Sequence, residues 1–334
     1  MAFLNLTRRE FLNSTLLLGT LSLTGCLNKS SQFIIRAVNE SLPQEWLHNL
    51  PSGWIYKNLK VNSEIYPYKM PFEEQTDLFA LEDGWITNLQ NDELLDMKID
   101  NWLPSLNSQA RSFSIGLSPE LRNKLLPIGF TPWVMLFRNG EPWRKKAKKS
   151  WEVLLEPGLQ DQVLLPNSSR MLISLVDRMG TSDELRRLRK QVKSFDDRNA
   201  LNWINSGKAK VAVLPLQRCI PSLVRDSRLS VILPEEGAPI NWTLLARPLS
   251  SRGLLSHDWL EETKEPPLLI KLLAKGWIPP IDYYQLSKGV SALPKKFQSA
   301  FFLSEKTWNN SWSLPPLKPL DRQALEMRWI KSVP

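Results

Sequence analysis

The feature that most constrains the fold is the rapid alternation of short apolar segments with helical ones. Strands are predicted at residues 33–38, 54–61 and 77–81 from their apolar residues. A helix carrying Trp46 is predicted between the first two strands, and the Glu-Asp-Gly-Trp sequence at residues 82–85 opens another helix directly after the third. This alternation predicts an α/β fold with a largely parallel sheet.

The length and composition fit two folded lobes and exclude several kinds of site. At about 150 residues per unit, a chain of 334 residues predicts two lobes, and 42% hydrophobic residues exclude a disordered or fibrous protein. Two histidines and two cysteines are too few for a three-histidine zinc site, a four-cysteine zinc site or a multi-disulfide scaffold. We therefore predict no metal site and no cofactor. The net charge of +9 alone leaves nucleic acid, an anionic membrane surface and simple solubility open.

The N-terminal residues have the arrangement of an export signal. Residues 7–12 match a twin-arginine motif, with Arg8 and Arg9 as the pair. The apolar stretch at residues 12–23 is shorter than the roughly 20 residues that a membrane-spanning helix needs. A charged start, a short apolar stretch and a small-residue end are typical of a cleaved signal peptide. The alternative is an amphipathic N-terminal helix whose arginines face solvent.

The Leu-Thr-Gly-Cys sequence that ends at Cys26 resembles a lipobox. We therefore expect residues 1–25 to be removed, Cys26 to carry lipid and residues 26–32 to form a tether. This predicts a lipid-anchored protein on the periplasmic side of a bacterial cell membrane. Cys219 then has no disulfide partner, and we expect it to be a small buried hydrophobic residue.

Four segments of the remaining chain resemble the solute-binding proteins of ABC importers, specifically the spermidine/putrescine-binding group. These segments are residues 77–89, 126–141, 150–170 and 234–248. Their shared order and spacing carry the resemblance, which covers most of residues 33–300. The alternative is a generic α/β protein with chance similarities.

The resemblance implies a two-lobed periplasmic-binding-protein-like fold of type 2, with a hinge between the lobes. Residues 33–130 and 245–334 would form lobe one, and residues 131–244 would form lobe two. A small-molecule solute would bind between the lobes, and closure would present it to an ABC permease. Such a protein needs no catalytic residue, and we expect it to be a monomer.

For a polyamine ligand, the resemblance implies aromatic faces beside the methylenes and carboxylates beside the ammonium groups. The aromatic candidates are Trp85, Phe130, Trp133 and Trp242. Each of them could instead pack in the core or hinge. Glu82 and Asp83 are the carboxylate candidates, although acids are also favoured in the first turn of a helix by its dipole.

The chain departs from the family at positions where acids are common. Ser168 and Arg170 lie in a segment where the family has Asp-Asp-x-Arg, and Thr243 stands where an acid follows the aromatic residue of the returning strand. Each missing charge-assisted hydrogen bond removes about 1.5–3 kcal/mol, so polyamine specificity is open. A neutral, zwitterionic or anionic ligand held by Arg170 and backbone amides is the alternative. Arg170 could instead form a salt bridge within lobe two.

Other function classes find little support in the sequence. The chain has no G-x-S-x-G, H-E-x-x-H, P-loop or G-x-G-x-x-G motif, so we predict that it is not an enzyme. The basic runs at residues 144–149 and 186–190 are interpreted as solvated helix faces, not as a nucleic-acid site. Tyr283 and Tyr284 resemble the paired tyrosines of ferric-ion-binding relatives but are interpreted as packing. The remaining alternative is an exported lipoprotein that acts as a non-transport scaffold.

Overall fold

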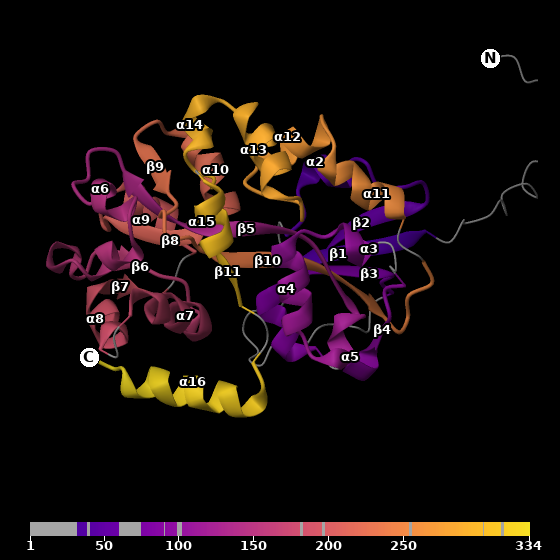
Figure 1. Ribbon diagram of the computed structural model, residues 1–334, viewed down its shortest axis with the longest axis horizontal. Helices are drawn as coiled ribbons and strands as arrows, with labels where there is room; N and C mark the ends of the chain where they lie inside the picture. Colours follow the sequence, from indigo (N-terminus) through magenta and orange to yellow (C-terminus); the bar gives the residue numbers. More distant parts are fainter. Residues whose placement is uncertain are drawn as a thin grey trace, which may run out of the picture.

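The structure is a computed structural model, and its overall arrangement is shown in Figure 1. It describes residues 32–38, 41–59, 75–89, 91–98, 102–180, 183–195, 198–253, 256–302, 304–314 and 317–334. The predicted export motif and Cys26 lie outside the described residues.

The strands form one mixed sheet in the order β2-β1-β3-β10-β5-β8-β6-β7, with β4 and β11 paired to β10 and β9 paired to β5. The strands are β1 (Phe33–Val38), β2 (Trp54–Leu59), β3 (Leu78–Glu82), β4 (Leu94–Leu95), β5 (Leu125–Arg138), β6 (Val163–Leu164), β7 (Val192–Ser194), β8 (Val211–Pro215), β9 (Leu229–Ile232), β10 (Pro239–Pro248) and β11 (Trp312–Ser313). The strands pair in parallel at both ends of the sheet, in β2-β1-β3 and in β8-β6-β7. In its centre, β10 runs antiparallel to β3 and β5, and β5 runs antiparallel to β8 and β9. The α/β prediction is confirmed, and the prediction of a largely parallel sheet is corrected to a mixed one.

The central strands β5 and β10 connect the two halves of the sheet. The first part of β5, up to Pro132, pairs with β10, whereas the part from Trp133 onward pairs with β8 and β9. One continuous strand of 14 residues therefore belongs to both halves. Figure 1 shows β5 and β10 in the middle of the molecule, with β1 and β3 on one side and β6, β7 and β8 on the other. This crossing is the place where a cleft between the halves would lie.

Helices flank the sheet in both halves (Figure 1). The α-helices are α2 (Gln44–Leu47), α3 (Trp102–Ser105), α4 (Ser108–Gly116), α5 (Pro119–Arg122), α6 (Arg144–Ala147), α7 (Ser169–Met179), α8 (Glu184–Gln191), α9 (Ala200–Asn205), α10 (Leu216–Arg225), α11 (His257–Glu261), α12 (Leu268–Leu273), α13 (Tyr283–Ser291), α14 (Lys295–Gln298), α15 (Glu305–Asn310) and α16 (Pro319–Lys331). The 3-10 helices are η1 (Asp83–Asn88), η2 (Asn91–Glu93), η3 (Trp151–Leu155), η4 (Pro157–Leu159) and η5 (Glu262–Lys264). The helix predicted after the third strand is thus a 3-10 helix.

The predicted division into lobes stays a prediction. Its first boundary, between residues 130 and 131, lies close to the point at which β5 changes partners. The C-terminal helix α16 falls in the range predicted for lobe one, yet it packs against α7, which falls in the range predicted for lobe two. In Figure 1, α16 lies below α7, and the C-terminus ends beside α8.

Buried side chains pack tightly against β5 and β10 where the two halves of the sheet join. A Cβ atom added at Gly129 would lie 2.0 Å from Cζ2 of Trp277, so only glycine lets the indole lie flat on this part of β5. The Trp277 indole N–H donates to the Thr243 hydroxyl at 3.1 Å, and that hydroxyl donates to the Ser41 carbonyl at 3.4 Å. Hydrogen-bonded polar groups of this kind can be buried without a large desolvation cost.

Cys219 is fully buried in α10, as predicted, and it is a free cysteine. Burial raises the pKa of its thiol to about 12, and nearby Arg218 opposes this only weakly. Among the described residues, no helix combines the length and the hydropathy needed to cross a bilayer.

Candidate functional site

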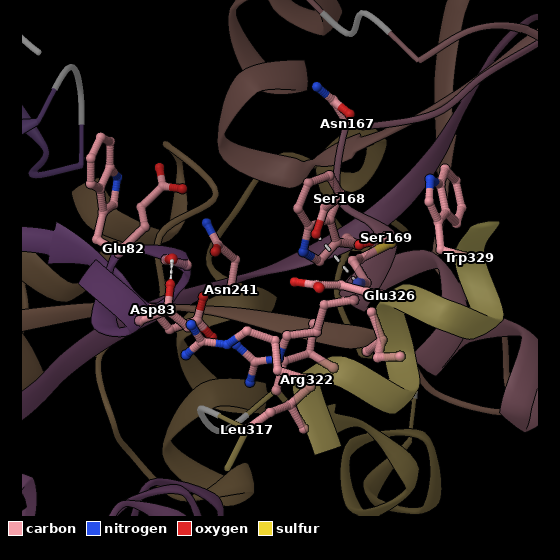
Figure 2. A pocket seen from close by; sticks show the side chains of 18 of the residues that line it. Glu82, Asp83, Asn167, Ser168, Ser169, Asn241, Leu317, Arg322, Glu326 and Trp329 are labelled. Carbon is pink, nitrogen blue, oxygen red and sulfur yellow. Dashed lines mark hydrogen bonds between the residues drawn. The ribbon is translucent and has the colours of Figure 1, made fainter. Parts of the chain in front are cut away.

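A cavity of about 1060 Å³ opens beside the β5–β10 crossing (Figure 2). One wall comes from the end of β3 and from η1, and the opposite wall comes from the N-terminus of α7 and from α16. Trp133 of β5 and two residues of β10, Ile240 and Asn241, also line the cavity. The carboxyl ends of strands are the usual place for ligands in open α/β sheets, and the cavity lies at that end of β3.

Asp83 is the most unusual group in the first wall. Its side chain is only 5% exposed, because β3 ends at Glu82 and the chain turns at once into η1. Burial raises the pKa of this carboxyl to about 7, and the negative charge of Glu82 adds to the increase. The positive charge of Arg170 and backbone hydrogen bonds from Trp242 and Gly84 act in the opposite direction. The Oδ2 atom is buried and has no hydrogen-bond partner among the described residues. A hydrogen-bond donor from a bound molecule would satisfy it.

The N-terminus of α7 places Arg170 in the second wall. The apolar residues of α7 form a buried stripe, which holds the helix against the core and leaves its first turn at the cavity. The Ser168 hydroxyl caps this helix by accepting a hydrogen bond from the Met171 backbone N–H at 3.3 Å. Burial lowers the pKa of the Arg170 guanidinium, Asp83 raises it, and Arg322 lowers it further. Arg170 is therefore electrostatically coupled both to Asp83 and to α16.

Four contacts anchor the C-terminal helix α16 and the residue after it to α7 and α8. The Arg328 guanidinium forms an ion pair with Asp177 of α7 at 2.6 Å. Arg189 of α8 donates to the Trp329 carbonyl at 2.7 Å and to the Ser332 hydroxyl at 2.9 Å. The Arg189 guanidinium also lies 4.3 Å from the centre of the Trp329 ring, a cation–π contact.

The anchored helix turns one face toward the cavity. Leu325, Glu326 and Trp329 lie three, four and seven residues after Arg322, which places all four on one side of the helix. In Figure 2, Arg322 extends from α16 toward the side of the cavity that carries Asp83 and Asn241. Sequence reasoning missed this wall. The helical spacing and Pro319 at the first turn are readable, but the packing of the helix against the cavity is not.

The structure brings six of the predicted ligand-binding residues to the cavity. These are Glu82, Asp83, Trp85, Trp133, Ser168 and Arg170. It places the other three in the core: Phe130 and Trp242 are fully buried with ring centres 4.9 Å apart, and Thr243 bonds to Ser41 and Trp277. The Trp242 indole N–H already forms a hydrogen bond within the protein, because it donates to the Ser313 hydroxyl at 2.7 Å.

Two other features of the sequence lie away from the cavity. The tyrosine pair begins α13, where Tyr284 is 74% exposed and Tyr283 packs near Trp308. Most of the basic side chains at residues 144–149 and 186–190 are exposed, as predicted, but Arg189 is used to anchor α16. Within the described part of the chain, no group of three His, Cys, Asp or Glu side chains is arranged to hold a metal ion.

Comparisons with known proteins place the fold. The sequence profile described as bacterial extracellular solute-binding protein matches residues 73–255, more than half of the chain. Curated protein sequences give no match.

Three solved structures are similar over nearly the whole chain. The spermidine/putrescine ABC transporter substrate-binding protein of Streptococcus pneumoniae has a TM-score of 0.69 at 12% identity and covers 91% of this chain and 98% of its own. A periplasmic thiamin-binding protein has a TM-score of 0.60 at 11% identity, covering 92% and 98% respectively. The ferric binding protein of Campylobacter jejuni has a TM-score of 0.57 at 13% identity, covering 90% and 99%. The predicted two-lobed periplasmic-binding-protein-like fold is thereby confirmed.

Proposed function

The chain belongs to the bacterial extracellular solute-binding proteins, and from this premise we propose that it captures a small solute in the cavity between β3–η1 and α7–α16 and delivers it to an ABC permease. The observation that carries this proposal is the buried Asp83 carboxylate at the cavity wall, whose Oδ2 atom has no hydrogen-bond partner within the described part of the chain. A protonated amine on the solute would supply the missing donor in a charge-assisted hydrogen bond.

The cavity can select its solute by aromatic contact as well as by charge. Trp85 and Trp133 are partly buried and line the cavity on the side of Asp83 and on the β5 crossing. Their ring faces would pack against methylene groups and attract a cation. A solute that contacts both walls stabilises the form in which the walls are close, and this closed form is what a permease would recognise. No step in such a cycle needs a nucleophile or a cofactor.

A polyamine-type solute is the form of the proposal that the sequence resemblance supports. Its structural support is Glu82, Asp83 and Trp85 at the first wall, together with Trp133 on β5. A second candidate, a solute of another chemical class, is favoured by Arg170 and Arg322, which line the same cavity. The proteins with similar structures are named for spermidine/putrescine, thiamin and ferric ion, so the fold accommodates several ligand classes. A non-transport scaffold would leave the Asp83 carboxylate without its partner.

The cellular setting belongs to the same proposal. Export through the Arg8–Arg9 motif and lipid attachment at Cys26 would hold the protein at the outer face of the cell membrane, where a solute-binding protein meets its permease. A monomer tethered in this way needs no nucleic-acid partner. Its surface basic residues would instead face lipid headgroups or acidic loops of the permease.

Isothermal titration calorimetry of the mature chain, residues 26–334, tests the proposal. Putrescine, spermidine, thiamine and amino acids would be titrated into the wild type and into the Trp85→Ala variant, with Trp143→Ala as a control away from the cavity. Saturable binding of at least one solute, weakened at least tenfold by Trp85→Ala and unchanged by the control, is expected. Absence of binding across this panel at millimolar concentrations would refute the proposal.

A further inference from the structure

Resting on the proposed function, we propose that the solute is dipolar: it carries a protonated amine that faces Asp83 and an oxyanion, a carboxylate or phosphate, that faces Arg170 and Arg322. The charges that the two walls bring together in one cavity point to this chemical class of ligand.

Two guanidinium groups line the α7–α16 side of the cavity, from helices far apart in the sequence. Arg170 comes from the first turn of α7 and Arg322 from the first half of α16. Arg170 lies close enough to Asp83 for that carboxylate to raise the pKa of its guanidinium, and close enough to Arg322 for the second guanidinium to lower it. The repulsion between the two guanidiniums is unfavourable, and an anion between them would reduce it. The planar guanidinium fork matches the geometry of a carboxylate or phosphate group.

The anchoring of α16 holds Arg322 at the cavity. The ion pair of Arg328 with Asp177 and the bonds of Arg189 to the end of the helix fix its second half against α7 and α8. The Arg322 side chain itself forms no ion pair with a described residue and remains exposed to the cavity. An anionic group of a solute in the cavity would supply an ion-pair partner for it.

The opposite wall has the complementary requirement. Only 5% of the surface of Asp83 is exposed, and no described residue donates a hydrogen bond to its Oδ2 atom. Glu82 lines the cavity beside it and adds negative charge at the same end. A protonated amine supplies both a donor and the opposite charge, whereas an anion at this wall would meet two carboxylates.

A solute with amines at both ends fits this arrangement poorly. One ammonium group could face Asp83, but the other would approach the two guanidiniums. Glu326 also lies on the α16 face, yet it is exposed and shares that face with Arg322. The cavity therefore brings carboxylates at η1 and guanidiniums from α7 and α16 to one space, and it favours a molecule that carries a charge of each sign.

A four-carbon series tests this inference because its members differ only in their end groups. Calorimetric titrations of the mature chain would compare putrescine, 4-aminobutanoate and succinate, with 3-aminopropyl phosphate to distinguish phosphate from carboxylate. We expect an amine with an oxyanion to bind at least tenfold more tightly than putrescine and succinate. Preference for 3-aminopropyl phosphate over 4-aminobutanoate assigns phosphate as the oxyanion, and the reverse assigns carboxylate.

The variant Arg322→Gln distinguishes a specific contact with the oxyanion from a general effect on solute binding. It should weaken binding of the preferred amino-oxyanion about tenfold while leaving putrescine unchanged or bound more tightly. Lys331→Gln removes the same charge from α16 at a position that does not line the cavity, and it should change neither affinity.

Two outcomes would overturn the inference, and they differ in what they mean for the proposed function. If putrescine or spermidine binds as tightly as the amino-oxyanions, or if Arg322→Gln weakens both classes alike, the dipolar ligand is refuted while solute capture stands. If no amine, amino acid or amino phosphate binds, solute capture is refuted, and the inference with it.

Discussion

Replacing Asp83 with asparagine should stabilise the empty protein at pH 8 and weaken its binding of amines ten- to a hundredfold. The Asp83 carboxyl holds its proton up to a pH of about 7 in the folded chain, compared with 3.8 for an unperturbed aspartate. As the pH rises from 4 to 7, the unfolded chain gives up this proton first, so the folded state progressively loses stability. The difference between these pKa values corresponds to about 4 kcal/mol at pH 8.

Asparagine removes this cost because its side chain is neutral at every pH. Its amide N–H₂ replaces the buried Oδ2 atom and lacks an acceptor there, which offsets about 1–3 kcal/mol of the gain. We therefore expect Asp83→Asn to raise the free energy of unfolding at pH 8 by about 2 kcal/mol. At pH 4, where the wild-type carboxyl is protonated in the folded chain, this gain vanishes and only the cost of the unpaired amide remains, so the variant should be less stable than the wild type by about 1–3 kcal/mol.

Thermal unfolding of the unliganded variant and wild type at pH 4 and pH 8 measures this effect. Asp92→Asn, which removes an exposed carboxylate from η2, is the matched control and should not shift the unfolding temperature. Calorimetry at pH 8 should show amine-bearing solutes bound to Asp83→Asn ten- to a hundredfold more weakly, because a charge-assisted hydrogen bond is lost. An unchanged or lowered unfolding temperature at pH 8, or retained affinity, would refute the role given to Asp83.

Three further predictions concern the scaffold and the anchor. Gly129→Ala should lower the free energy of unfolding by about 1–3 kcal/mol or more, measured by urea denaturation, since its Cβ would lie 2.0 Å from the Trp277 ring; an unaffected midpoint would contradict this packing. Cys219 should resist a thiol reagent in the folded protein and react once denatured, because it is buried and its pKa is raised to about 12; rapid labelling of the folded protein would contradict its burial. Cys26→Ser should release the protein from the membrane fraction to the soluble fraction in a cell fractionation experiment, and retention in the membrane fraction would refute the lipid anchor.

The parts of the fold that were predictable from the sequence are those with a self-contained pattern. Residues 168–179 have apolar residues at helical spacing, and α7 runs from Ser169 to Met179 with that stripe buried. The strands at residues 33–38 and 77–81 were found for the same reason, because short apolar runs between turns are sufficient to define them. The antiparallel centre of the sheet depends on long-range pairing of β5 and β10, which no local pattern contains.

The candidate site was predicted most completely where one segment supplies several residues. Glu82, Asp83 and Trp85 follow each other at the end of β3, so the strand-to-helix turn was enough to group them. On β10, by contrast, side chains alternate between faces, and Asn241 lines the cavity while the predicted Trp242 points into the core. The contribution of Arg322 depends on the packing of α16 against α7. Such a tertiary contact is invisible in a single sequence.

The location of a bound solute tests the central claim most directly. A crystal structure of the mature protein with its tightest-binding solute would show which groups the ligand touches. We expect the solute in the cavity between η1 and α16, with its amine nitrogen at about 3 Å from Oδ2 of Asp83 and its oxyanion on Arg322. A solute bound outside this cavity, or one whose oxyanion faces Asp83, would contradict it.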